Sequence, residues 1–134
     1  MGTWDIGPFD NDTAADFCGG LDRADAGERA GLVRAALDGA LACPGYLDSD
    51  EGAPAVAAAA LVAAQGPGGE PHRSAYGPGE PLPALPAEFG PLAVRALDRV
   101  VADGSELAGL WDDAGHGELW RRDIARLRAV LELL

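Results

Sequence analysis

Three carboxylates near the N-terminus, Asp10, Asp12 and Asp16, have the residue type and spacing to bind a divalent cation. Carboxylate oxygens are preferred ligands of Ca²⁺ and Mg²⁺, and Asp12 and Asp16 would lie about one turn apart on a helix. The segment departs from the calcium-loop signature, because alanines stand where further ligands and a glycine belong. Acids in a first turn also accept backbone N–H bonds and complement the helix dipole. We therefore expect helix capping here, with a metal site as the alternative.

A second acidic run at residues 48–52 (DSDEG) also precedes an expected helix and also fails the calcium-loop spacing. Capping is again the expected role. The two acidic clusters could still meet in space and form one site. This alternative is a small metal-dependent enzyme or ligand binder that adds Asp48 or Asp50 to the N-terminal aspartates and uses His72 or His116 as the proton carrier.

The histidines and cysteines show no spacing typical of a zinc or redox site. His72 and His116 both lie in glycine-rich surroundings, and neither Cys18 nor Cys43 belongs to a CxxC pair. If Cys18 and Cys43 lie on two antiparallel helices, they are roughly 15 Å apart. A disulfide needs Cα atoms within about 7 Å, so we expect two reduced thiols. No GxSxG motif is present, and we assign no catalytic residue and no cofactor.

The elements that must position these residues are predicted to be helices. At 134 residues the chain is one ordinary domain, and its apolar spacing predicts an all-α bundle of five or six helices. The expected parts are an extended arm at 1–10, a helix capped by Asp10 or Asn11, a helix opened by Asp25 and Glu28, a helix from Ser49 or Asp50 to Gln65, a Pro/Gly-rich connection at 66–86, a helix after Pro86, a short helix from Ser105, and a last helix at 118–134.

The apolar spacing also predicts which faces point inward. In the second helix the inward residues are expected to be Leu32, Val33, Ala36, Leu37, Ala40 and Leu41. The third helix is rich in alanine, and small residues permit close helix approach. We therefore expect the third helix to be central.

Charge excludes several functions. The formal net charge is -12, from 22 acidic residues against 10 basic ones, so a phosphate backbone would be repelled and we expect no nucleic-acid partner. No apolar run is long enough to cross a membrane, and no secretory signal is recognisable, which predicts a cytoplasmic protein. Four arginines fall on the last helix, Arg121, Arg122, Arg126 and Arg128. We expect them to pair with acids of other helices, with an acidic or phosphorylated partner as the alternative.

The opening MGTWDIGPFDNDTAADF resembles the bacterial family catalogued as domain of unknown function number forty-two fifty-nine. The residues that carry the resemblance are Gly2, Trp4, Gly7, Phe9, Asp10, Asn11, Asp12, Ala14 and Asp16. The stretch SELAGLW, from Ser105 to Trp111, and the last helix are similar to the end of that family. Asp5 stands where the family has glycine. The resemblance implies a shared fold and no chemistry.

The N-terminal motif has a structural explanation. Trp4 and Phe9 would bury large apolar areas while Gly2 and Gly7 allow tight turns, so the arm is expected to lock the fold and Trp4→Ala to cost about 3–5 kcal/mol of unfolding free energy. We expect an acidic cytoplasmic domain that binds a protein partner or associates with itself, without catalytic activity. One version is a small acidic protein that neutralises a basic one through salt-sensitive association.

Overall fold

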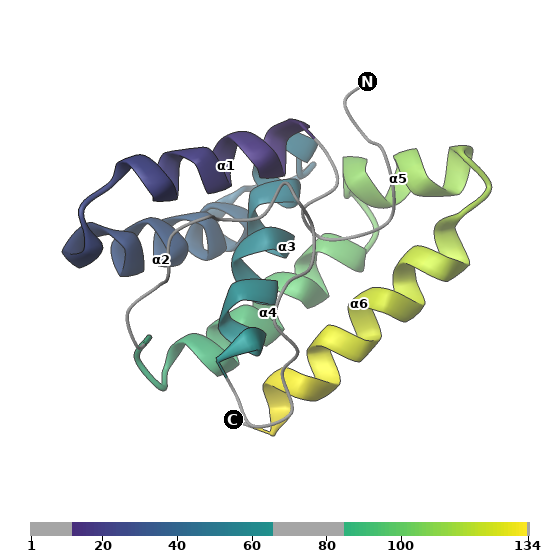
Figure 1. Cartoon of the computed structure of the whole chain (residues 1–134). Helices are drawn as coiled ribbons and strands as arrows, with labels where there is room; N and C mark the ends of the chain where they lie inside the picture. Colours follow the sequence, from purple (N-terminus) through teal and green to yellow (C-terminus); the bar gives the residue numbers. More distant parts are fainter. Residues whose placement is uncertain (1–11, 66–84, 134) are drawn as a thin grey trace.

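The computed structural model describes residues 12–65 and 85–133, which form a bundle of six helices (Figure 1). The helices are α1 (Asp12–Arg23), α2 (Ala26–Ala42), α3 (Ser49–Ala64), α4 (Phe89–Val101), α5 (Glu106–Asp113) and α6 (Gly117–Glu132). The described residues form no strand beyond an isolated bridge between Leu47 and Ser105. The predicted all-α class is therefore confirmed. The expected arm at 1–10 and most of the 66–86 connection lie outside the described residues.

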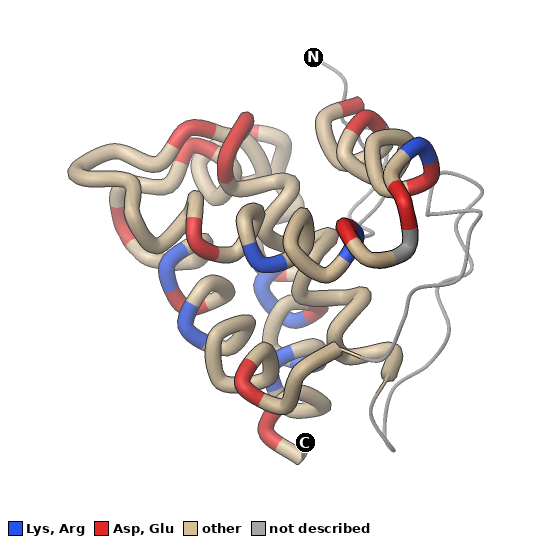
Figure 2. The backbone as a smooth tube through the Cα atoms, turned by 90° about the vertical axis from the view of Figure 1, so that its left-hand side faces the viewer, with Lys and Arg blue, Asp and Glu red and all other residues tan. Residues whose placement is uncertain are grey.

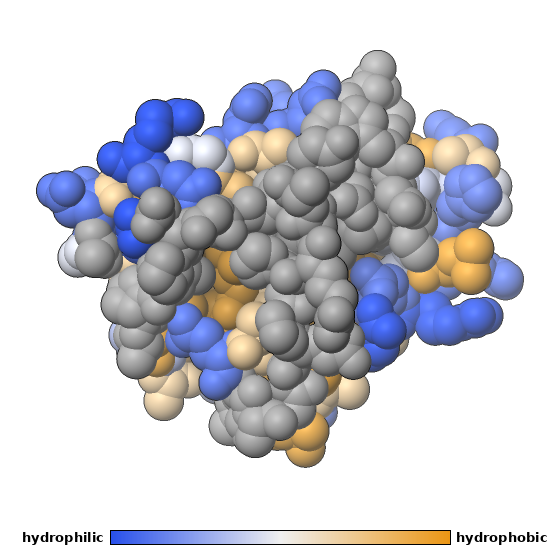
Figure 3. All heavy atoms as spheres, in the orientation of Figure 1, coloured by the Kyte–Doolittle hydropathy of each residue, from blue (hydrophilic) through white to orange (hydrophobic). Residues whose placement is uncertain are grey.

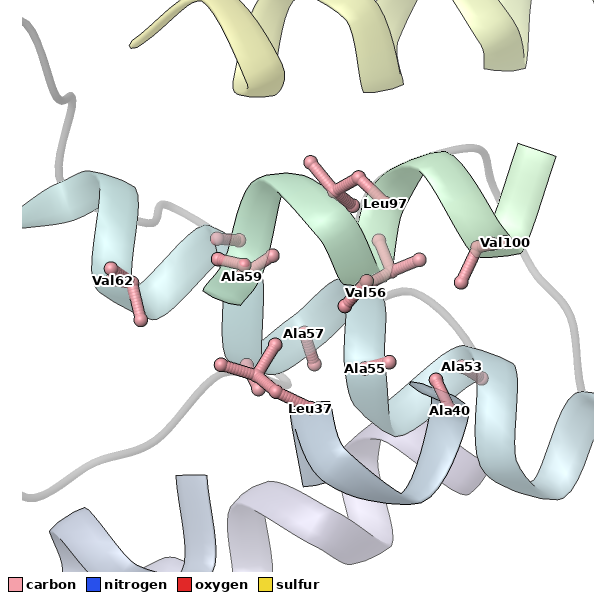
Figure 4. Packing of buried hydrophobic residues seen from close by; sticks show 14 of the residues in the cluster. Leu37, Ala40, Ala53, Ala55, Val56, Ala57, Ala59, Val62, Leu97 and Val100 are labelled. Carbon is pink, nitrogen blue, oxygen red and sulfur yellow. The ribbon is translucent and has the colours of Figure 1, made fainter. Parts of the chain in front are cut away.

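Helix α3 runs through the middle of the bundle, as its small residues predict. Every residue from Ala55 to Ala63 is buried, and α3 contacts each of the other five helices. Figure 4 shows the short side chains of α3 between Leu37 and Ala40 of α2 and Leu97 and Val100 of α4. Because alanine lets neighbouring backbones come close, α3 contributes mainly short side chains, and the largest fully buried side chains come from the surrounding elements.

Two loops far apart in the sequence are joined beside the start of α3. The backbone N–H of Leu47 donates to Gly104 O (2.7 Å), and Leu47 O accepts from Glu106 N–H (2.8 Å). The guanidinium of Arg99 donates to Gly45 O (2.5 Å). Ser105 is buried in this junction and its hydroxyl accepts from Ala108 N–H (3.4 Å), so it caps α5 as expected.

Capping of α3 differs from the prediction. Asp48 occupies the N-cap position, but its side chain makes no capping hydrogen bond. The backbone N–H of Ser49 instead donates to the carboxylate of Glu106 (2.7 Å). This bond comes from a residue 57 positions away, so local spacing around the 48–52 acidic run could not reveal it. Asp25, at the N-cap of α2, likewise makes no side-chain cap bond.

The inward face of α2 also differs from the prediction at one residue. Val33, Leu37 and Ala40 are fully buried, whereas Leu32 has 38% of its surface exposed. Since α2 packs mainly on α3 and α4, its buried stripe is narrow, and Leu32 falls on the side that faces α1.

A tight corner joins α5 to α6. Gly115 has φ +81°, a left-handed conformation that suits glycine. Arg121 pairs through two bonds with Asp112 (2.5 and 3.1 Å), and this pair lies directly over Gly117, where a Cβ would overlap Asp112 Oδ1. The corner therefore favours glycine at position 115 for its left-handed backbone, whereas a side chain at position 117 would displace the ends of the Asp112 and Arg121 side chains.

Candidate functional site

A hollow with a volume of about 330 Å³ lies between α1 and α2 and ends at the first turns of α3. We call it the α1–α2 groove. Helices α1 and α2 both pack on α3 (Figure 1), which leaves a space between them. The groove is lined by Phe17, Leu32, Ala35, Ala36, Gly39, Asp50, Glu51 and Pro54. Six of these eight residues are apolar or glycine, so the lining is mostly apolar with carboxylates at one end.

The acidic end of the groove is built by the start of α3. Glu51 lies against α2, because a Cβ at Gly39 would be only 2.8 Å from Glu51 Oε2. Asp50 and Glu51 are both exposed. Pro54 lies inside the helix and lacks an N–H, so the carbonyl of Asp50 cannot receive the usual helical bond from position 54. This end therefore offers acceptors and no side-chain donor.

Two arginines, Arg34 and Arg128, are committed to carboxylates outside the groove. Arg34 pairs with Asp38 (3.4 Å) and Glu88 (2.7 Å), and Arg128 pairs with Asp98 (2.8 Å) and with Glu132. Among the described residues, no arginine pairs with Asp50 or Glu51. In Figure 2 the uppermost turns carry acidic segments, whereas most arginine segments lie in the middle and lower parts. The acidic end of the groove is therefore left without a counter-charge from the described residues.

The expected pairing with acids of other helices holds for two of the last-helix arginines, Arg121 and Arg128, whereas Arg126 pairs within its own helix. Arg121 pairs with Asp112, Arg126 with Asp123 (2.7 Å) and Arg128 with Asp98. Arg122 is exposed and makes no ion pair with any described residue. A smaller hollow of about 170 Å³ lies between α4 and α6 beside Arg121 and Arg128, but both arginines are already engaged with carboxylates.

The N-terminal aspartates do not form a metal cage with other described residues. Asp12 and Asp16 are both exposed on α1, and no group of three histidine, cysteine or acidic side chains within 12–65 and 85–133 is arranged to hold a metal ion. Phe17, which follows Asp16, lines the same groove as Asp50 and Glu51, whereas Asp12 and Asp16 themselves are not among the residues that line it. Asp10, Asn11 and the rest of the motif, Gly2, Trp4, Gly7 and Phe9, lie outside the described residues.

The other candidate residues have structural surroundings. His116 is exposed at the N-cap position of α6, and its ring meets Trp111 edge-on at 6.3 Å. Cys18 and Cys43 are free thiols, as expected. Burial and the neighbouring Asp22 raise the pKa of the Cys18 thiol to about 12, so this sulfur is a core group and a poor nucleophile. His72 lies outside the described residues.

Sequence spacing missed the α1–α2 groove. Leu32 was expected to point inward, and an exposed leucine next to buried Val33 gives no periodic signal. The proline at position 54 within an otherwise helical run was the one available sign of an unusual backbone acceptor.

No described helix is both long and apolar enough to span a bilayer.

The family model described as Domain of unknown function (DUF4259) matches residues 2–123 of the chain. No curated protein matches the chain, and no solved structure does.

Proposed function

Because the chain belongs to the DUF4259 family, whose description states no activity, we propose its function from its own groove: it binds a basic helical segment of a protein in the α1–α2 groove, without catalysis. One observation carries the proposal. The groove joins an apolar lining to two carboxylates, Asp50 and Glu51, that have no arginine partner among the described residues. Such a surface is complementary to a helix that presents one apolar side chain beside lysine or arginine.

The chemistry of the lining favours a protein segment over a small molecule. Small-molecule sites typically combine an enclosed volume of about 300–1,000 Å³ with several converging polar groups. The α1–α2 groove lies at the lower end of that range, and its polar side chains are the two carboxylates alone. A helix laid along the groove could insert a side chain against Phe17 and Leu32 without being enclosed.

Electrostatics favours a basic partner and disfavours nucleic acid. The net charge of -12 attracts basic proteins and speeds their encounter. At contact, lysine or arginine would donate to the side chains of Asp50 and Glu51. Phosphate groups would meet the same carboxylates and be repelled. The association should weaken as salt rises, since exposed pairs are screened.

We place this interaction in the cytoplasm. Two free cysteines in a small domain are typical of a reducing compartment. Partner and domain would then meet without disulfide formation.

A designed peptide tests the proposal. The probe is a fluorescent helix of about four turns that carries leucine and arginine on one face, and its binding to the purified protein is followed by anisotropy. Asp50→Asn combined with Glu51→Gln should weaken binding roughly tenfold, which corresponds to about 1.4 kcal/mol. Asp103→Asn combined with Asp113→Asn is the matched control, because it removes the same charge from two exposed acids outside the groove.

Two results would oppose the proposal. If both double variants weaken the peptide equally, its binding follows net charge and not the groove. If a peptide with the same residues in an order that scatters the leucines binds as well, the apolar lining has no role. Leu32→Asp gives a third check, because it places a charge on the exposed apolar wall and should also lower affinity.

A further inference from the structure

The outer face of α6 has the chemistry that the α1–α2 groove lacks. One exposed row runs along the helix at steps of three and four, formed by Leu119, Arg122, Arg126, Ala129 and Leu133. Leu119 has 48% and Leu133 68% of its surface exposed. Figure 3 shows hydrophobic surface near both ends of α6, next to hydrophilic side chains. We call these five residues the α6 outer row.

The arginines of the α6 outer row are available for a new contact. Arg122 is exposed and has no ion-pair partner among the described residues. Arg126 is 75% exposed and pairs only with Asp123 of its own helix in the described part of the chain. Arg121 and Arg128, on other sides of α6, are held by Asp112 and Asp98. Binding through the outer row therefore costs no bond between helices.

We infer that the segment bound in the α1–α2 groove is the α6 outer row of a second copy of this chain. The inference rests on the proposed function and names its partner. Leu119 and Arg122 are about 4.5 Å apart along the helix axis, at 1.5 Å per residue. With Leu119 against Phe17 and Leu32, the guanidinium of Arg122 can turn toward Asp50 and Glu51, and Arg126 lies one further turn along.

This contact joins two different surfaces and so leaves both ends of a pair open. One copy contributes its groove and the other its α6, so a dimer still has one free groove and one free α6 outer row. Further copies can then add in a chain or a closed ring. The net charge of -12 on each copy opposes this association. Salt near 0.15 M, with a Debye length of about 8 Å, screens that long-range repulsion more than the pairs in contact.

Complementary variants test the inference by sedimentation velocity over a series of protein concentrations. The groove variant is Asp50→Asn with Glu51→Gln, and the helix variant is Leu119→Ser with Arg122→Glu. Wild-type protein is expected to form species of two and more chains as concentration rises, and each variant alone to stay monomeric. An equal mixture should form dimers and nothing larger, because the mixture supplies one intact groove and one intact α6 outer row per pair. Arg95→Glu is the control for charge, since Arg95 is exposed on α4 and forms no ion pair with a described residue.

The outcomes separate this inference from the proposed function. If wild-type protein stays monomeric, or the mixed variants fail to form dimers, while the basic peptide still binds the groove, the second copy is not the partner and the proposed function stands. If neither the peptide nor the second copy binds, both fail. If Arg95→Glu abolishes association as fully as the helix variant does, the contact does not lie on α6. Thermal melts by circular dichroism confirm that each variant is folded before it is compared.

Discussion

The carboxylate of Glu106 accepts a hydrogen bond from the backbone N–H of Ser49 at 2.7 Å, and thereby joins the first turn of α5 to the first turn of α3. The bond holds the start of α3 in place, and Asp50 and Glu51 of the groove are the two residues after Ser49 in that helix. It also lowers the pKa of the Glu106 carboxyl, because the charged form accepts from Ser49. The position of the groove's acidic end thus depends on a residue of another helix.

Two replacements of Glu106 should destabilise the fold to different degrees. Glu106→Gln keeps an acceptor oxygen and removes the charge, so it should lower the melting temperature less than Glu106→Ala, which removes the bond altogether. Glu118→Gln is the control, because Glu118 lies in the first turn of α6 and makes no bond to another described helix. If Glu118→Gln destabilises as much as Glu106→Gln, the effect belongs to the helix dipole and not to the bond with Ser49.

The same bond predicts a pH dependence of stability. The folded-state pKa of Glu106 is below its ordinary value, so its contribution is present above the unfolded pKa of about 4.3 and is lost as the pH falls through the folded value. Denaturant melts of wild-type protein and Glu106→Gln should therefore differ by a constant amount at neutral pH and converge below about pH 4.3. A difference that grows on acidification would contradict the assignment.

Gly117 is expected to tolerate alanine only when Asp112 is absent. A Cβ at position 117 would overlap Asp112 Oδ1 and lie 2.9 Å from the guanidinium of Arg121, so Gly117→Ala must displace these side-chain ends and should weaken their pair. In an Asp112→Ala background the obstacle is gone, and alanine is the better helix former. Chemical unfolding of wild-type protein, the two single variants and the double variant should show that Gly117→Ala lowers the free energy of unfolding when Asp112 is present. In the Asp112→Ala background it should cause no loss. Equal losses in both would mean that backbone conformation, not the ion pair, requires glycine.

The alanines of α3 are predicted to have no room for larger side chains. Ala57 is fully buried in the packed centre of the bundle (Figure 4). Ala57→Leu should cost about 1–3 kcal/mol of unfolding free energy, the usual penalty for an overfilled core. Ala42→Leu, at an exposed position at the end of α2, should change it by no more than about 0.5 kcal/mol. A neutral Ala57→Leu would show that the contacts of α3 are loose.

The two thiols should differ in reactivity. The pKa of buried Cys18 is raised to about 12, so at pH 8 only about one molecule in ten thousand carries its thiolate. Cys43 is half-buried, and its thiol donates to Tyr46 O (3.5 Å). Mass spectrometry after treatment with iodoacetamide should find Cys43 modified in native protein and both thiols modified in denaturant. Early modification of Cys18 would show that α1 opens readily.

The sequence predicted the helices better than the spaces between them. The helix predicted after Pro86 is present as α4, where Leu92, Ala96 and Val100 are buried at helical spacing. The start of α5 followed from Ser105, whose cap is local. The predicted position of Leu32 was wrong, because its spacing to the other apolar residues of α2 fits an inward face. Leu32 is exposed because α1 and α2 are separated by the groove that it lines.

The candidate site depended on contacts that spacing cannot encode. Glu106 reaches Ser49 across 57 positions, and Glu51 lies against Gly39 through the packing of α2 on α3. The groove itself brings Phe17 of α1 together with Asp50 of α3, which are 33 positions apart in the sequence. Tertiary packing decides each of these relationships, so none has a signature within a single helix.

The N-terminal aspartates give the last prediction. Asp12 and Asp16 are exposed and belong to no three-residue group suited to a metal among the described residues, so Mg²⁺, Ca²⁺, Mn²⁺ and Zn²⁺ should leave the melting temperature unchanged. A bound ion at a hundred times its dissociation constant would add about 2.7 kcal/mol of stability, which a thermal-shift assay detects readily. Asp113→Asn serves as the control for removing one exposed charge. A metal-dependent rise that Asp10→Asn or Asp12→Asn abolishes, and Asp113→Asn does not, would establish the metal site instead of capping.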